Sequence, residues 1–245
     1  MPGQLPLEKL LGPARSAPYK HAAGGDPGRA GELYRWASEL AGTFHSQLAY
    51  VEVAVRNAID AQLVLWNAAQ PPAYTGEWTA EGNTAPPLYA VLGSSLGKAR
   101  SDAAKRAGDR HPNHPRHQAP VTHDDTLAQF MFGTWHKLIH PPAKNDDPAK
   151  QQQLWREATS KAFPKAAQDE TGRLYIAGKL ETLRKLRNRV AHHENLLDVR
   201  IRHRLNDILA LLGKIDEDYP AIIAKSNPLR EIARRDPRMT WTQES

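Results

Sequence analysis

The chain has 245 residues, a formal net charge of +6 at pH 7 and no cysteine. The lack of cysteine excludes disulfides, thiolate nucleophiles and cysteine-ligated metals. No run of about 18 apolar residues occurs, and the N-terminus lacks the apolar core of a signal peptide, so we expect no transmembrane helix and a cytoplasmic protein.

The chain is predicted to form one all-α domain with two flanking segments. Residues 1–27 are rich in proline, glycine and alanine and are expected to form an irregular arm. Residues 28–220 are expected to form a single helical bundle with additional helices and long loops, because apolar residues recur at helical spacing and no stretch alternates as paired strands do. Residues 221–245 read as a polar, basic tail.

Two helices are predicted at the start of this domain. The first begins near Pro27 and stops near Gly42, and Thr43 is expected to cap the second. The second helix, from about Phe44 to Asn67, has the most regular apolar face in the chain. Its members follow at intervals of three or four residues: Phe44, Leu48, Val51, Val55, Ile59, Leu63 and Trp66.

The middle of the chain alternates loops and helices. Residues 68–87 are expected to form a loop, residues 88–107 a helix, and residues 111–117 a histidine-rich, basic loop. A metal site in that loop is the weaker interpretation, because prolines alternate with the histidines and no pair has helical i,i+4 spacing. Thr122 is expected to cap a helix that continues as far as Leu138.

Three further helices complete the prediction. They cover residues 149–162, about 172–195, and about 198–218. The second of them is the most informative, because polar groups gather at its end: Arg187, Asn188, His192, His193 and Glu194. On an ideal helix Asn188 and His192 share one face, and Arg187 and Glu194 share another.

These residue types suit phosphate chemistry. Arginine offers a fixed fork of donors that matches phosphate oxygens, and histidine gives or takes a proton near neutral pH. Residues 173–204 also hold nine Lys or Arg against three acids, a net charge of +6 that equals the excess of the whole chain. A basic stretch of this kind is either a solvated helix face or a surface for the RNA backbone.

Three strings carry a resemblance to a known family. The string Leu186–Glu194 (LRNRVAHHE) resembles the R-x4–6-H motif of HEPN-superfamily ribonucleases, and in particular their Abi-like (AbiD/AbiF-type abortive infection) branch. Residues 50–59 (YVEVAVRNAI) are similar to an E-x-x-x-R-N-x-I segment of Abi-like proteins, and residues 127–135 (LAQFMFGTW) to an aromatic-Gly-x-Trp signature. The last string is also explained by core packing of Phe132 and Trp135.

The resemblance implies a HEPN-like helical bundle that works as a homodimer. It implies a metal-independent endoribonuclease without a cofactor, acting as a toxin-like effector in phage defence. Arg187 would hold the scissile phosphate, Asn188 would orient it or the histidine, and His192 would be the acid or base. His193 is the alternative catalytic histidine, because both spacings fit the motif.

Supporting residues are expected to come from two helices. Arg184, Arg189 and Glu194 flank the motif, and Glu52, Arg56 and Asn57 would brace or line the same site. An alternative for Glu52 and Arg56 is a simple i,i+4 ion pair. Because Glu194 stands where a related branch carries a tyrosine that is nucleotidylated, silencing by that route is not expected.

Two other functions remain open. One is a non-catalytic module that binds RNA, including a regulatory small RNA, through the same basic face. The other is a helical scaffold for a protein partner, in which the polar residues only close a helix and offset its dipole. No partner in a membrane is expected.

Overall fold

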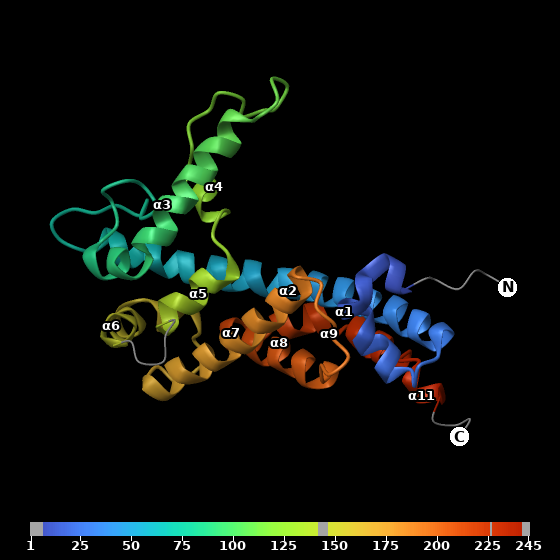
Figure 1. Cartoon of the computed structure of the whole chain (residues 1–245). Helices are drawn as coiled ribbons and strands as arrows, with labels where there is room; N and C mark the ends of the chain where they lie inside the picture. Colours follow the sequence, from blue (N-terminus) through green and yellow to red (C-terminus); the bar gives the residue numbers. More distant parts are fainter. Residues whose placement is uncertain (1–6, 142–146, 226, 242–245) are drawn as a thin grey trace. The chain divides into compact units, whose positions relative to one another are not determined.

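The computed structural model describes residues 7–141, 147–225 and 227–241, and all regular secondary structure in these ranges is helical (Figure 1). The all-α prediction is confirmed. The helices are α1 Leu7–Ala22, α2 Pro27–Ala68, α3 Pro86–Gly108, α4 His123–Leu127, α5 Phe132–Ile139, α6 Ala149–Glu157, a 3-10 turn at Thr159–Ala162, α7 Glu170–Ala191, α8 Ile201–Ile215, α9 Tyr219–Ala224, α10 Pro228–Arg234 and α11 Arg238–Trp241. Within these ranges no helix is both long and apolar enough to cross a membrane.

The chain divides into two compact units. Unit 1 comprises Met1–Val51, Lys185–Ala210 and Asp218–Ser245, and unit 2 comprises Glu52–Arg184 and Leu211–Glu217. Helices α2, α7 and α8 each contribute residues to both units, so the units do not correspond to separate stretches of chain. A single domain over residues 28–220 stays a prediction.

Most of the expected irregular arm is instead helix α1, Leu7–Ala22, and residues 1–6 of the arm lie outside the described residues. Gly12 interrupts the helix with φ 73° and ψ 165°, which lets Pro13 begin a new helical segment, where a missing N–H has no cost. Lys20 pairs with Glu8 across the interruption. Leu7 and Tyr19 are buried, and their burial explains why a stretch rich in proline and glycine is ordered.

The two predicted N-terminal helices are one helix of 42 residues, α2. The predicted stop at Gly42 is wrong, because the apolar face continues across it from Leu40, 0% exposed, to Phe44, 0% exposed. Burial of that face outweighs the cost of about 1 kcal/mol for glycine inside a helix. Thr43 is not an N-cap; its hydroxyl donates back to the carbonyl of Glu39 at 2.8 Å.

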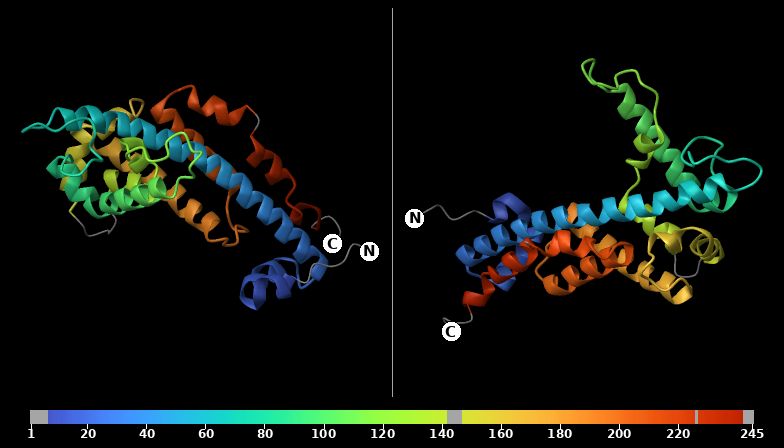
Figure 2. Two further views of the ribbon diagram at one scale, coloured as in Figure 1. Left: turned by 90° about the horizontal axis from the view of Figure 1, so that it is seen from above. Right: turned by 180° about the vertical axis from the view of Figure 1, so that it is seen from behind.

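In unit 1 the C-terminal residues lie alongside the first half of α2 (Figure 2). The indole N–H of Trp36 donates to the carbonyl of Ile232 at 2.9 Å, and the guanidinium of Arg238 lies over the same indole ring, 5.4 Å from its centroid. The described part of the predicted polar tail therefore contains packed helices, and its buried residues Leu229 and Ile232 supply the apolar contacts. Residues 226 and 242–245 of the tail lie outside the described residues.

In unit 2 the aromatic residues form the core. Phe132 and Trp135 are buried, as core packing predicts, and Trp78 stacks on Phe130 at 5.8 Å between ring centroids. Thr122 caps α4 through a capping box with Asp125, which confirms the predicted cap. The helix it begins is shorter than predicted, because the chain leaves helical geometry between α4 and α5, where Met131 is extended at φ −85° and ψ 160°.

Candidate functional site

The end of α7 determines the geometry of the sequence motif. The helix ends at Ala191, whereas the sequence predicts an end near Asn195. The N–H of Glu194 donates to the carbonyl of Arg189 at 2.9 Å, and the N–H of His193 donates to Val190 at 3.2 Å. This pair of bonds is a Schellman motif, with His193 as the left-handed residue at φ 53°.

His192 lies at the last position that follows the helix. Its N–H still donates to the carbonyl of Asn188 at 2.9 Å, so the two residues stay one helical turn apart. Glu194 lies outside the helix, so the expected helical face shared by Arg187 and Glu194 does not form. His192 and His193 are both exposed, and neither imidazole hydrogen-bonds to a described residue.

Arg189 holds the turn that follows α7. Its guanidinium donates to the carbonyl of Asn195 at 2.5 Å and to Asp198 at 2.6 Å, and it lies 3.7 Å from the carboxylate of Glu194. The hydrogen bond from Arg189 lowers the pKa of Asp198 below its ordinary value. Because its charge is matched by two carboxylates, Arg189 is a structural brace for this turn rather than a free phosphate ligand.

Arg187 differs from the other arginines of the motif. It is half-buried, and among the residues that the structure describes it has no ion pair and no side-chain hydrogen bond. A guanidinium that is partly removed from water and unpaired is a ready binding group for an anion. Asn188, the next residue, is also half-buried.

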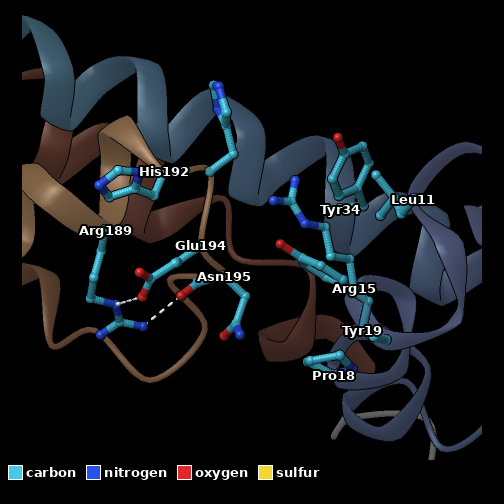
Figure 3. Close-up of a pocket in the computed structure, with 11 residues that line it drawn as sticks. Leu11, Arg15, Pro18, Tyr19, Tyr34, Arg189, His192, Glu194 and Asn195 are labelled. Atoms are coloured by element: carbon cyan, nitrogen blue, oxygen red, sulfur yellow. Dashed lines mark hydrogen bonds and ion pairs between the residues drawn. The ribbon is translucent and has the colours of Figure 1, made fainter.

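A pocket of about 270 Å³ lies in unit 1 beside the turn after α7 (Figure 3). His192 and Glu194 lie on one side of it, and Arg15 and Tyr34 lie on the other. Arg15 is exposed and unpaired among the described residues. Arg187 and Asn188 do not line this pocket. The remaining residues that line it are Leu11, Ala14, Pro18, Tyr19, Arg189, His193 and Asn195.

Helix α1 forms one side of this pocket, and this helix is not predicted from the sequence. Tyr19 is buried edge-on against Tyr34, 5.3 Å between ring centroids. Burial, and then the neighbouring Tyr34, raises the pKa of Tyr19 above its ordinary value of 10.0. A signal for this side of the pocket exists in the sequence, because Leu7, Leu11, Tyr19 and Ala23 follow one another at intervals of four or eight residues.

Four predicted supporting residues belong to unit 2: Glu52, Arg56, Asn57 and Arg184. The Nε of Arg56 donates to the amide oxygen of Asn57 at 3.4 Å. Arg184 is held by Glu181 in a two-pronged ion pair at 2.7 and 3.0 Å, which raises its pKa. The expectation that these residues brace the motif stays a prediction.

Much of the predicted basic stretch is neutralised within the chain. Arg173 is 1% exposed and donates to the carbonyl of Ile139 at 2.5 Å and to Glu170 at 2.6 Å. Arg204 pairs with Asp207 at 3.1 Å. With Arg184 and Arg189 also paired, the free charge is smaller than the sequence count suggests, and it includes Arg187, Arg200 and Arg202.

No three His, Asp or Glu side chains gather into a possible metal site within the part of the chain that the structure describes. Comparisons with family models, with curated proteins and with solved structures find no match.

Proposed function

We propose that this protein is a metal-independent endoribonuclease of the HEPN type. We propose further that its fold is a HEPN-like helical bundle and that it acts in phage defence as Abi-like proteins do. The observation that carries the proposal is Arg187, which has no ion pair among the described residues and lies five residues ahead of the exposed His192 at the end of α7. An all-helical fold without a strand among residues 7–141, 147–225 and 227–241 is compatible with such a bundle.

The reaction is an internal phosphoryl transfer. The 2′-hydroxyl of the RNA loses its proton to a base and attacks the adjacent phosphorus. The bond from phosphorus to the 5′-oxygen breaks, and that oxygen receives a proton from an acid. The products are a 2′,3′-cyclic phosphate and a 5′-hydroxyl, and a solvent-accessible imidazole can serve as base or acid near neutral pH.

In this proposal His192 moves the proton and Arg187 stabilises the charge on the phosphate, with Asn188 as its neighbour. Two copies of the chain would each supply one motif. Arg15 and Tyr34, which line the pocket together with His192 and His193, would hold the nucleotide next to the scissile bond. His193 has a backbone role at the Schellman position, and this favours His192 as the catalytic histidine.

The test uses purified chain and labelled RNA in the presence of EDTA, with the cut ends identified chemically. Wild type is expected to yield cyclic phosphate ends, and Arg187→Ala and His192→Ala are expected to lose at least about 100-fold in rate. His193→Gly is the matched control, because glycine keeps the left-handed backbone while the imidazole is removed. His203→Ala removes another exposed histidine of unit 1.

Two outcomes decide against this assignment. Equal cleavage by wild type and His192→Ala would place the chemistry elsewhere. Loss of cleavage in His193→Gly alone would make His193 the catalytic residue.

For the role in defence, cells that express wild type are expected to stop growing during phage infection, whereas cells that express His192→Ala continue.

A second candidate is a non-catalytic RNA-binding module. It is favoured by the structural roles of Arg189, His193 and Glu194, which form or brace the end of α7 without any need for catalysis. Under this alternative wild type binds RNA but leaves it intact for hours, and Arg187→Ala weakens binding while His192→Ala does not. A protein scaffold would show neither binding nor cleavage.

A further inference from the structure

Three arginines of unit 1 surround a second pocket. Arg202 comes from α8, and Arg230 and Arg234 come from α10, and together they line a cavity of about 500 Å³. The other residues that line it are Leu205, Asn206, Ala233 and Met239. None of the described residues that line this cavity carries a carboxylate, in contrast to the surroundings of Arg189 and Arg204.

The three guanidinium groups have no partner within the chain as described. All three side chains are exposed, and none makes an ion pair or a side-chain hydrogen bond with another described residue. Arg230 and Arg234 are four residues apart on one short helix, so their like charges repel each other. An anion between α8 and α10 would remove this repulsion.

Other arginines nearby are neutralised. Arg235, the next residue after Arg234, pairs with Glu39 at 3.2 Å. Arg238 is held by Asp236 at 2.6 Å and donates to the carbonyl of Leu197 at 3.0 Å. Carboxylates of the chain therefore pair with Arg235 and Arg238, whereas no carboxylate among the described residues pairs with the three arginines that line this pocket.

We propose that Arg202, Arg230 and Arg234 form a binding site for the phosphate backbone of single-stranded RNA, separate from the motif at the end of α7. Guanidinium groups match phosphate oxygens in pairs of hydrogen bonds, and Asn206 adds an amide that can donate to phosphate or ribose. The side chain of Met239, which is 59% exposed, offers an apolar surface against which a ribose can pack. The choice of RNA rests on the proposed function, because the phosphate chemistry alone is shared with DNA.

The site would hold the strand while another part of it is cut. Because both pockets are lined only by residues of unit 1, one strand that enters both would depend on them together. Binding at the arginine pocket would contribute to affinity and to its salt dependence, and the end of α7 would determine the rate of cleavage.

The experiment measures binding of a labelled 20-nucleotide RNA by fluorescence anisotropy between 50 and 300 mM salt. The protein is the full chain with His192→Ala, so that cleavage does not interfere. The test variant adds Arg202→Gln, Arg230→Gln and Arg234→Gln. The control adds Arg235→Gln instead. Arg235 is the residue after Arg234, and its charge is already paired with Glu39.

For the triple variant we expect at least a tenfold rise in Kd at low salt and a fall of about 2 in the slope of log K against log salt, since each lost phosphate contact removes about 0.7. For Arg235→Gln we expect less than a twofold rise. Each single variant is measured as well, and a partial loss in each of the three supports the site even where the triple variant is unstable.

The outcomes separate this inference from the proposed function. Wild type that binds RNA through these arginines but never cuts it would leave the site standing and overturn the nuclease assignment. Equal binding by the triple and control variants, or no RNA binding by the starting protein, would overturn the site. If DNA of the same sequence binds as tightly as the RNA, the pocket binds nucleic-acid phosphates in general, and its assignment to RNA is overturned. A polyglutamate peptide that displaces RNA at equal charge would identify an acidic protein partner instead.

Discussion

The N–H of Glu194 donates to the carbonyl of Arg189 across the turn that ends α7, at 2.9 Å, and the side chains of the same two residues approach to 3.7 Å. The hydrogen bond and the ion pair together end the helix before the two histidines. They also determine the backbone conformation of each histidine. His192 therefore follows the helix and His193 is left-handed, although the sequence presents them as equal neighbours.

The backbone of His193 gives the first prediction. A left-handed residue other than glycine costs about 1–2 kcal/mol, and a β-branched residue suffers most. We expect His193→Gly to unfold at the same urea concentration as wild type or higher, and His193→Val to lose about 1–2 kcal/mol. His192→Val, one residue earlier, is the control. A less stable glycine variant would contradict the left-handed conformation.

A histidine in unit 2 gives a prediction for pH dependence. Both ring nitrogens of His123 form hydrogen bonds. Nδ1 lies 2.9 Å from Thr79 Oγ1, and Nε2 lies 2.9 Å from Asp60 Oδ1. Burial lowers the pKa of His123, but the hydrogen bond and charge of Asp60 outweigh it, and the pKa is raised above 6.5. A raised pKa means that the folded protein binds the proton more tightly than the unfolded chain.

The contribution of His123 to stability is therefore complete below pH 6.5 and is lost as the pH rises through the folded pKa. We expect the free energy of unfolding, measured with urea between pH 5.5 and 8.5, to fall with rising pH. In His123→Gln this part of the slope should vanish. A variant with the same slope as wild type would show that other groups cause it.

The pair of arginines on Asp125 gives a prediction for acid. Arg116 and Arg110 donate to the Asp125 carboxylate at 2.7 and 3.0 Å, and the hydrogen bond from Arg116 is the main reason that its pKa lies well below 3.8. A lowered pKa gives stability that is present above the unfolded value of 3.8 and is lost as the pH falls toward the folded value.

We expect Asp125→Asn to lower the free energy of unfolding by about 2 kcal/mol at pH 7, since hydrogen bonds to charged groups contribute about 1.5–3 kcal/mol. The difference from wild type should shrink as the pH is lowered below 4. Asp124→Asn is the matched control, because Asp124 lies in the same first turn of α4. A difference that is constant from pH 7 to pH 3 would contradict the ion-pair explanation.

Two glycines of α7 give opposite expectations for the same change. A Cβ on Gly172 would lie 1.7 Å from the carbonyl oxygen of Ala167, whereas a Cβ on Gly178 would meet nothing within 4 Å. We expect Gly172→Ala to cost at least about 2 kcal/mol. Gly178→Ala should stabilise the helix by about 0.5–1 kcal/mol. Thermal unfolding of both variants measures the two changes in stability. Equal changes would show that the backbone at residue 167 moves to make room for the added methyl group.

Local patterns in the sequence were sufficient for the helical class, the buried face of α2, the cap at Thr122 and the core position of Trp135. Each depends on residues within a few turns of one another, where spacing and capping chemistry decide the outcome. The grouping of polar residues at the end of α7 is also visible in the sequence, and it directs attention to the motif that carries the proposed function.

Only the tertiary structure decided which of those polar residues are free. Contacts far apart in the chain bury Arg173 against Ile139 and pack Tyr19 of α1 beside Tyr34. The same packing of apolar faces keeps α2 helical through Gly42. Charge counts and local propensities miss these results, because ion pairing and burial are properties of neighbours in space and not of neighbours along the chain.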